Sequence, residues 1–157
     1  MNTKQLARCI RRVEKLFYNA KFDESLLLAS KILQKNKNNT QLMILKGKLL
    51  QLSDKGNLAG ALKMFKEVLE LDNGNVEALI ELAYFYYAVQ NESRKSVKCF
   101  ERAIELSEKN VETAYIGKAK AFIDLGEYRK AKVVLRKYLA INPKSRQARE
   151  LLAECNT

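Results

Sequence analysis

The 157-residue chain contains no histidine and no tryptophan, and it has only one proline and six glycines. The absence of histidine removes the commonest general base and metal ligand of proteins. Neither a glycine-rich phosphate loop nor a GxSxG motif occurs in the sequence. The sequence therefore predicts no catalytic residue, no metal site and no cofactor, and we expect a protein that is not an enzyme.

Cysteines and long apolar runs are also scarce. Cys9, Cys99 and Cys155 are odd in number and far apart, so they show neither metal-ligand spacing nor a disulfide framework. We interpret them as small packing residues in a reducing, cytoplasmic setting. No apolar run approaches the roughly 18 residues of a membrane span, and charges interrupt the N-terminal segment. Neither a membrane helix nor a secretory signal is predicted.

The chain does contain an internal repeat of about 35 residues. Each of four segments begins with a turn or a capping residue, followed by a small residue and, four positions later, by an apolar one. The small residues are Ser25, Ala61, Ser96 and Ala131, at spacings of 36, 35 and 35, and the later residues are Ala29, Phe65, Phe100 and Leu135. Internal periodicity in this range indicates a stacked helical solenoid.

The same pattern predicts about nine helices in a single all-α domain. They are expected near residues 3–18, 22–35, 40–53, 57–70, 75–89, 93–107, 111–124, 127–141 and 145–155. The repeats lie near 6–39, 40–75, 76–110 and 111–144, and the helix at 145–155 caps the last one. Residues of N-cap type stand at several starts, namely Asp23, Asn57, Asn75, Ser93 and Ser145. Small residues such as Gly47, Ala61, Ala119 and Ala131 are expected where helices cross closely.

The period and these residues resemble the tetratricopeptide repeat. The best match runs from Ala114 to Pro143, where Tyr115, Ala119, Phe122, Gly126, Tyr128, Ala131 and Leu135 fall in register. The resemblance implies a right-handed α-solenoid of antiparallel helix pairs, with a concave groove in which peptides bind. It is specific for the fold and unspecific for the function, because this family serves many processes.

The segment AYFYYA, residues 83–88, places four aromatic residues in succession. In the helix predicted there, Tyr86 faces the paired helix and Phe85 faces a neighbouring repeat. Tyr84 and Tyr87 lie near Ile80 on a third face, which the resemblance places in the groove. We predict a peptide-binding site made of Ile80, Tyr84, Tyr87, Ile116, Lys48 and Lys120. The alternative, that the two tyrosines only cover each other and the neighbouring helices, stays open.

One binding mode of the family is disfavoured. Members that hold the carboxylate tails of heat-shock chaperones use Lys and Asn on successive first helices. The matching positions here are Ile10, Glu14, Leu45, Glu77 and Glu81. Acids where cations are needed argue against a carboxylate clamp.

The net charge of +11 is concentrated at the two ends of the sequence. Residues 1–40 carry a net +6 and residues 111–157 a net +5, whereas 41–75 carry +1 and 76–110 carry −1. The predicted basic surface consists of Arg8, Arg11, Arg12, Lys15, Arg136, Lys137, Arg146 and Arg149.

Such a surface suits an acidic partner or nucleic acid, or is simply solvated. The basic ends lack interleaved aromatics on which bases could stack, so an acidic protein is favoured over nucleic acid. We therefore predict a cytoplasmic adaptor or chaperone-like module that binds a protein or peptide. Electrostatic binding of nucleic acid or another polyanion through the basic ends is the alternative.

Overall fold

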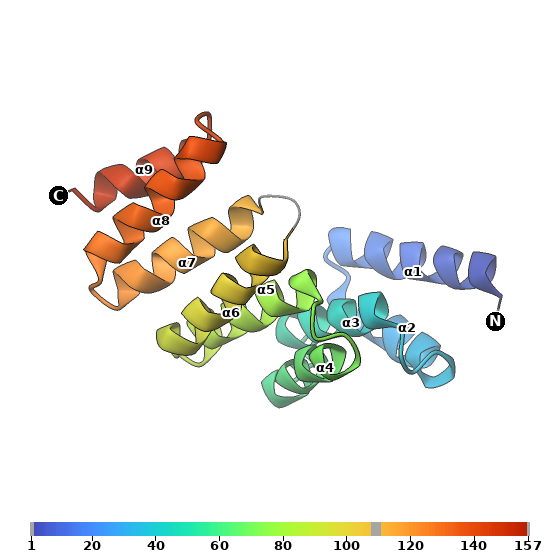
Figure 1. The fold of residues 1–157 in the computed structure, drawn as a ribbon. Helices are drawn as coiled ribbons and strands as arrows, with labels where there is room; N and C mark the ends of the chain where they lie inside the picture. The colour runs from blue at the N-terminus through green and yellow to red at the C-terminus, as the bar shows by residue number, and fades with distance from the viewer. Residues whose placement is uncertain (1, 108–110, 157) are drawn as a thin grey trace. The chain divides into compact units, whose positions relative to one another are not determined.

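The computed structural model describes residues 2–107 and 111–156, which form helices joined by short turns (Figure 1). The helices of this part of the chain are α1 (Thr3–Tyr18), α2 (Phe22–Lys35), α3 (Thr40–Leu52), α4 (Leu58–Leu71), α5 (Val76–Tyr84), α6 (Ser93–Leu106), α7 (Glu112–Asp124), α8 (Tyr128–Ile141) and α9 (Arg146–Glu154). A π-helix, Phe85–Val89, directly continues α5. Counting this π-helix with α5, the nine predicted helices are confirmed to within one residue at each end. None of the helices described is long and apolar enough to cross a bilayer.

The chain divides into two compact units, residues 1–73 and 74–157, and each is described by itself. In the first unit, α1 to α4 pack in sequence order as two antiparallel helix pairs. In the second unit, α5 and α6 form one pair, α7 and α8 form another, and α9 packs on α8. The fold class is therefore all-α and of the α-solenoid type, as predicted. The single domain expected from the repeats stays a prediction.

Small buried residues let the paired helices approach each other closely. Ala61, Ala119 and Ala131 are completely buried, as predicted, and Gly47 is buried as well. A Cβ atom added to Gly47 would lie 2.5 Å from Cε1 of Phe65. Since carbon atoms cannot approach so closely, the aromatic ring occupies the space that any other residue would need.

Side-chain caps begin five of the helices. Asn57, Asn75 and Ser145 each accept a hydrogen bond from a backbone N–H of the first turn, as predicted. Asn2 and Asn39 do the same for α1 and α3, although they were not among the predicted caps. Each such bond satisfies a donor that a helix start would otherwise leave without a partner.

Asp23 and Ser93 are not N-caps, so these two predictions are wrong. Both lie inside the first turns of α2 and α6, and their side chains bond across repeats instead. The Ser53 hydroxyl, just after α3, donates to the Asp23 carboxylate, and the Ser93 hydroxyl donates to Asp124 at the end of α7. Each bond links the start of the second helix of one pair to the end of the first helix of the next. In the first unit the aspartate stands at the start of the second helix of the pair and the serine at the end of the next helix. In the second unit the serine stands at the start and the aspartate at the end.

This arrangement predicts an acid-sensitive contribution to stability in the first unit. The hydrogen bond from Ser53 lowers the pKa of Asp23 below its ordinary value of 3.8, and the backbone N–H and charge of Lys55 act in the same direction. A carboxyl with a lowered folded pKa stabilises the fold above pH 3.8, and that contribution is lost as the pH falls below 3.8 through the folded pKa. We expect Ser53→Ala to raise the pKa of Asp23 toward 3.8 in an NMR carboxyl titration. Ser93→Ala is the control, and an unchanged pKa in Ser53→Ala would contradict the assignment.

Candidate protein-binding surface

The aromatic run of residues 84–87 lies where α5 changes into a π-helix. The backbone N–H of Gln90 donates to the carbonyl of Phe85 at 3.2 Å, five residues earlier. This wider turn advances each side chain by a smaller angle than an α-helix does, and such turns occur often at functional sites. The sequence pattern gave no indication of it, because apolar periodicity distinguishes poorly between these two helix types.

The four aromatic residues have different surroundings. Phe85 is 2% exposed and belongs to the core, as predicted. Tyr86 is only half-buried, and the Lys95 ammonium of α6 lies 5.5 Å from its ring centroid. Tyr86 therefore faces the paired helix, as predicted. It is less buried than we expect of a side chain that lies between two packed helices.

Tyr84 connects three helices of the second unit. Its hydroxyl donates to the Thr113 carbonyl at the start of α7, at 3.2 Å. Its ring stands edge-on to the ring of Phe100 in α6, with centroids 5.1 Å apart. Burial, followed by the charges of Glu81 and Tyr87, raises the pKa of Tyr84 above its ordinary 10.0. The hydroxyl therefore stays protonated at neutral pH and serves as a hydrogen-bond donor.

Tyr87 and Ile80 are the other partly accessible residues of this region. Both are half-buried, and Tyr87 packs against a buried cluster formed mainly by α7, α8 and α9, with Val97 of α6. Part of each tyrosine is therefore committed to packing, and the remainder is accessible. Lys120 is half-buried on α7, the helix that packs beside α5. We name Ile80, Tyr84, Tyr87 and Lys120 the α5–α7 face.

Two of the predicted groove residues do not belong to this face. Ile116 is 2% exposed and lies in the core, so it is wrong as a surface contact. The corresponding isoleucines of the first unit, Ile10 and Ile44, are 7% and 2% exposed. The first helices of successive pairs contact each other within each unit, and this contact covers positions that the sequence assigned to solvent. Lys48 is half-buried on α3, in the first unit.

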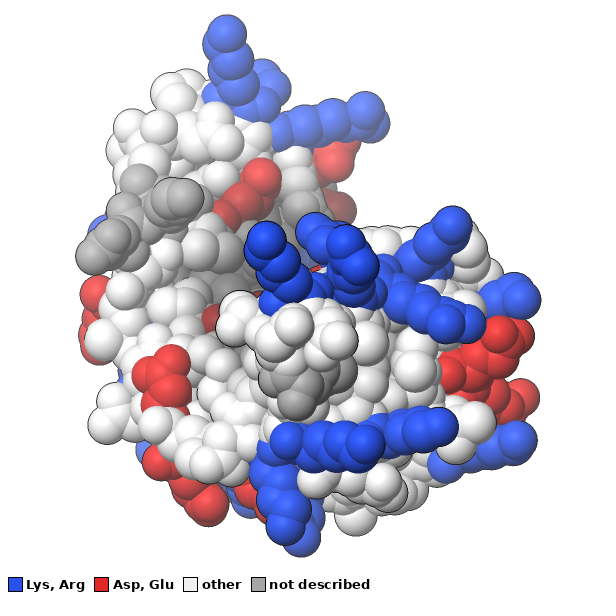
Figure 2. Space-filling model, turned by 90° about the vertical axis from the view of Figure 1, so that its right-hand side faces the viewer, with Lys and Arg blue, Asp and Glu red and all other residues white. Residues whose placement is uncertain are grey.

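The basic residues of α1 are exposed. Arg8, Arg11, Arg12 and Lys15 lie at three- and four-residue spacings on that helix. Figure 2 shows many Lys and Arg side chains standing out from the visible face, among uncharged residues and fewer Asp and Glu side chains. A charged stripe of this kind attracts anions over a range of about 10 Å at moderate salt.

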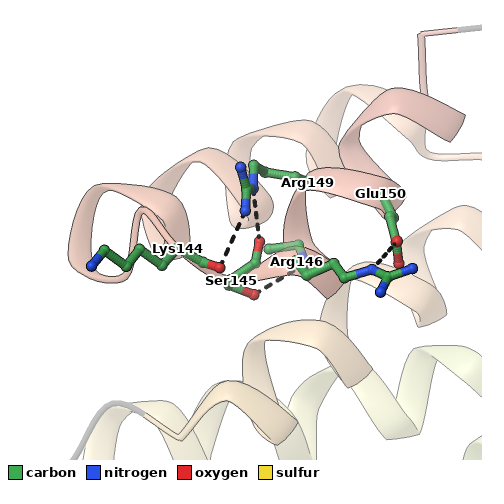
Figure 3. A network of polar contacts seen from close by, with 6 residues as sticks. Lys144, Ser145, Arg146, Arg149 and Glu150 are labelled. Atoms are coloured by element: carbon green, nitrogen blue, oxygen red, sulfur yellow. Dashed lines mark hydrogen bonds and ion pairs between the residues drawn. The ribbon is translucent and has the colours of Figure 1, made fainter.

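The basic residues near the C-terminus differ in their interactions, although Arg136, Lys137, Arg146 and Arg149 are all exposed. In α9, Nε of Arg146 lies 2.6 Å from Oε1 of Glu150 (Figure 3). Arg149 donates to the Ser145 carbonyl at 3.4 Å and to the Lys144 carbonyl at 3.3 Å. The two α9 arginines therefore hold local structure, whereas the prediction treated them only as surface charge.

These helix pairs and their small-residue crossings define an α-solenoid protein built from tandem helix-pair repeats. Models of the tetratricopeptide repeat match residues 52–94 and residues 112–155. The chain belongs to the tetratricopeptide repeat family. Proteins of this family are generally non-enzymatic scaffolds that bind other proteins. Within the described residues, no group of three or more cysteine and acidic side chains could hold a metal ion.

Solved structures of other repeat proteins share this fold. PilW, a "widely conserved type IV pilus biogenesis factor", is 15% identical, with a TM-score of 0.85 over 99% of this chain and 70% of that one. A MamA protein is 21% identical, with a TM-score of 0.78 over 98% of this chain and 82% of that one. The first repeat domain of Spaghetti (RPAP3), bound to the HSP90 peptide SRMEEVD, is 20% identical, with a TM-score of 0.69 over 80% of this chain and 97% of that one. At these identities the likeness shows the fold alone. No curated protein sequence matches the chain.

Proposed function

We propose that the chain is a non-catalytic protein-interaction module, adaptor or chaperone-like, whose α5–α7 face binds a protein or peptide segment. The observation that carries the proposal is the pair of half-buried tyrosines beside Ile80. Their rings are held in place by Phe100 and by the core cluster, so binding them costs little side-chain entropy. Ordered aromatic side chains of this kind often dominate the affinity of protein interfaces.

The acidic side chains near this face restrict the partner. Glu77 and Glu81 stand on α5, and the charge of Glu81 contributes to the raised pKa of Tyr84. A carboxylate clamp needs cations at such positions, so the partner segment contacts this face mainly through apolar groups. Lys120 adds one positive charge on α7. Cys9, Cys99 and Cys155 form no disulfide, and the proposal places the module in a reducing cytoplasm.

The proposal can be tested with a phage-displayed library of random peptides selected on the purified chain. Binding of a selected peptide, measured by fluorescence anisotropy, should weaken at least tenfold in the double variant Tyr84→Ala with Tyr87→Ala. Tyr18→Ala is the matched control, because Tyr18 is 82% exposed on α1 and should change binding less than twofold. Selected peptides that bind the double variant as well as they bind the wild type would contradict this site.

The double variant is expected to remain folded at reduced stability. Tyr84→Ala removes one hydrogen bond and one edge-to-face ring contact, which together cost about 1–3 kcal/mol. Binding is therefore compared at a temperature below the unfolding transition of every variant, as judged by circular dichroism.

A second candidate function is electrostatic binding of nucleic acid or another polyanion by the basic ends. The observation that favours it is the exposed stripe Arg8, Arg11, Arg12 and Lys15 on α1. Retention on heparin that falls steeply with salt would indicate release of counterions from a polyanion. Loss of that retention in the triple variant Arg8→Ala, Arg11→Ala and Arg12→Ala would locate it on α1. The peptide selection and the heparin measurement therefore distinguish the two functions.

A further inference from the structure

A groove with an apolar floor runs between α6, the end of α7 and the start of α8 in the second unit. Its volume is about 490 Å³, and its lining residues are Arg94, Val97, Lys98, Glu101, Phe122, Leu125, Glu127 and Lys130. A hollow of about 320 Å³ continues it along α8, with Phe122 and Lys130 in common and Val133 and Val134 beyond them. We name this combined surface the Phe122 groove. Volumes of this size accommodate a few side chains of a ligand.

The floor of the Phe122 groove is apolar and closely packed against the core. Phe122 is 8% exposed, and Val97 and Val134 are 8% and 9% exposed. Val133, by contrast, is 65% exposed at the side of the groove. An apolar ligand side chain that covers Val133 would remove apolar surface from water, which favours binding.

The rim of the groove carries an excess of positive charge. The cations are Arg94, Lys98, Lys118, Arg129 and Lys130, and the carboxylates are Glu101 and Glu127. Lys118 lies 3.0 Å from Glu101, and Lys130 lies 2.7 Å from Glu127. Arg94 is 4.0 Å from Glu127, at the limit of an ion pair. Lys98 and Arg129 have no acidic partner among residues 2–107 and 111–156.

Phe122 itself reinforces the preference for anions. The ammonium groups of Lys118 and Lys130 lie 5.8 Å and 5.6 Å from its ring centroid. The ring thus holds two cations beside the groove through attraction to its π-electrons. A ligand carboxylate that approaches this rim therefore meets an excess of positive charge, which attracts it.

From this geometry we propose that the Phe122 groove is a second docking surface, separate from the α5–α7 face, for an acidic protein segment with an apolar anchor. The anchor covers Val133 at the side of the groove, and the flanking Asp or Glu carboxylates pair with Lys98 and Arg129. Single-stranded nucleic acid fits this groove less well. Phe122 is almost buried and faced by two ammonium groups, so it offers no open ring for a base to stack on.

The test is a subtractive selection from a phage-displayed random-peptide library. The library is first depleted on the charge-reversed variant Lys98→Glu with Arg129→Glu and then selected on the wild-type chain. Peptides that depend on the groove survive this depletion, whereas peptides bound elsewhere are removed. We expect enriched peptides in which an apolar residue is flanked by Asp or Glu. Failure to enrich any peptide, or enrichment without an excess of acidic residues, would overturn the proposal.

Enriched peptides are then measured by fluorescence anisotropy. Their binding should weaken at least tenfold in Lys98→Glu with Arg129→Glu, and also in Val133→Asp, which places a carboxylate beside the anchor position. The matched control, Lys31→Glu with Lys35→Glu, makes the same change of net charge at exposed positions of α2 and should alter binding less than twofold. Equal losses in both charge-reversed variants would indicate nonspecific attraction and overturn the site.

Two further measurements distinguish peptide docking in this groove from nucleic-acid binding and from peptide binding at the α5–α7 face. A fluorescent oligothymidylate that binds the wild type and is lost only in Lys98→Glu with Arg129→Glu would assign the groove to nucleic acid instead. The variant Tyr84→Ala with Tyr87→Ala should retain the enriched peptides, because the α5–α7 face is not part of this groove. Failure of the docking surface proposed here is therefore distinguishable from failure of the peptide site on that face.

Discussion

Replacing Phe85 with alanine should lower the free energy of unfolding by about 3–5 kcal/mol, the range for truncating a buried aromatic side chain. Phe85 is 2% exposed and is the first residue of the π-helix. Its removal leaves a cavity that the surrounding helices fill only in part, since the π-helix and α5 fix the backbone on both sides. Urea unfolding followed by circular dichroism measures the change.

Val89→Ala is the matched control for this variant. Val89 ends the same π-helix but is 38% exposed, so its truncation should cost about 0.5 kcal/mol or less. If Phe85→Ala cost no more than Val89→Ala, the packing of Phe85 in the core would be wrong. A large loss in both would instead show that the π-helix itself tolerates no change.

Gly117→Leu should destabilise the second unit by about 3 kcal/mol, at the upper end of the range for overpacking. A Cβ atom at Gly117 would lie 2.2 Å from Cζ of Phe100, and the Phe100 side chain is fully buried. The ring cannot move aside freely, because the Tyr84 ring stands edge-on against it. Leucine favours helix far more than glycine does, so a loss of stability would come from crowding between α6 and α7 rather than from the backbone.

A double-mutant cycle gives this prediction its control. Phe100→Ala alone should cost about 3–5 kcal/mol, because it empties a buried site. In that background, the leucine at position 117 can enter the vacated space, so Gly117→Leu should become much less costly or even stabilising. Additive losses in the double variant would show that Phe100 is not what excludes a side chain at position 117.

The sequence alone determined the repeats, the helices and the family. The predicted helices agree with the observed ones because helical periodicity and caps such as Asn57 and Asn75 depend on residues within about four positions of each other. Small residues at fixed spacing likewise marked the close crossings at Ala61 and Ala131. These properties are local or strictly periodic, and both kinds can be recognised in a single chain.

The candidate site was only partly predictable. Tyr84 and Tyr87 lie at an accessible face, but part of each ring packs against neighbouring helices. Ile116 was assigned to the same face and is buried. Periodicity gives the angle between two side chains on a helix, but it does not say which neighbouring helix covers that direction.

Only the tertiary structure decided which distant side chains meet. Asp23 and Ser93 have the residue types of helix caps, yet they bond to Ser53 and Asp124 across a repeat boundary. The Phe122 groove likewise joins residues of α6, α7 and α8 that share no sequence motif. Such contacts depend on how successive helix pairs cross and on how close their ends come. Interactions within one helix turn decide where each helix begins and ends. Side-chain packing between repeats decides how the helices cross, and thus which residues about 30 positions apart in the sequence come into contact.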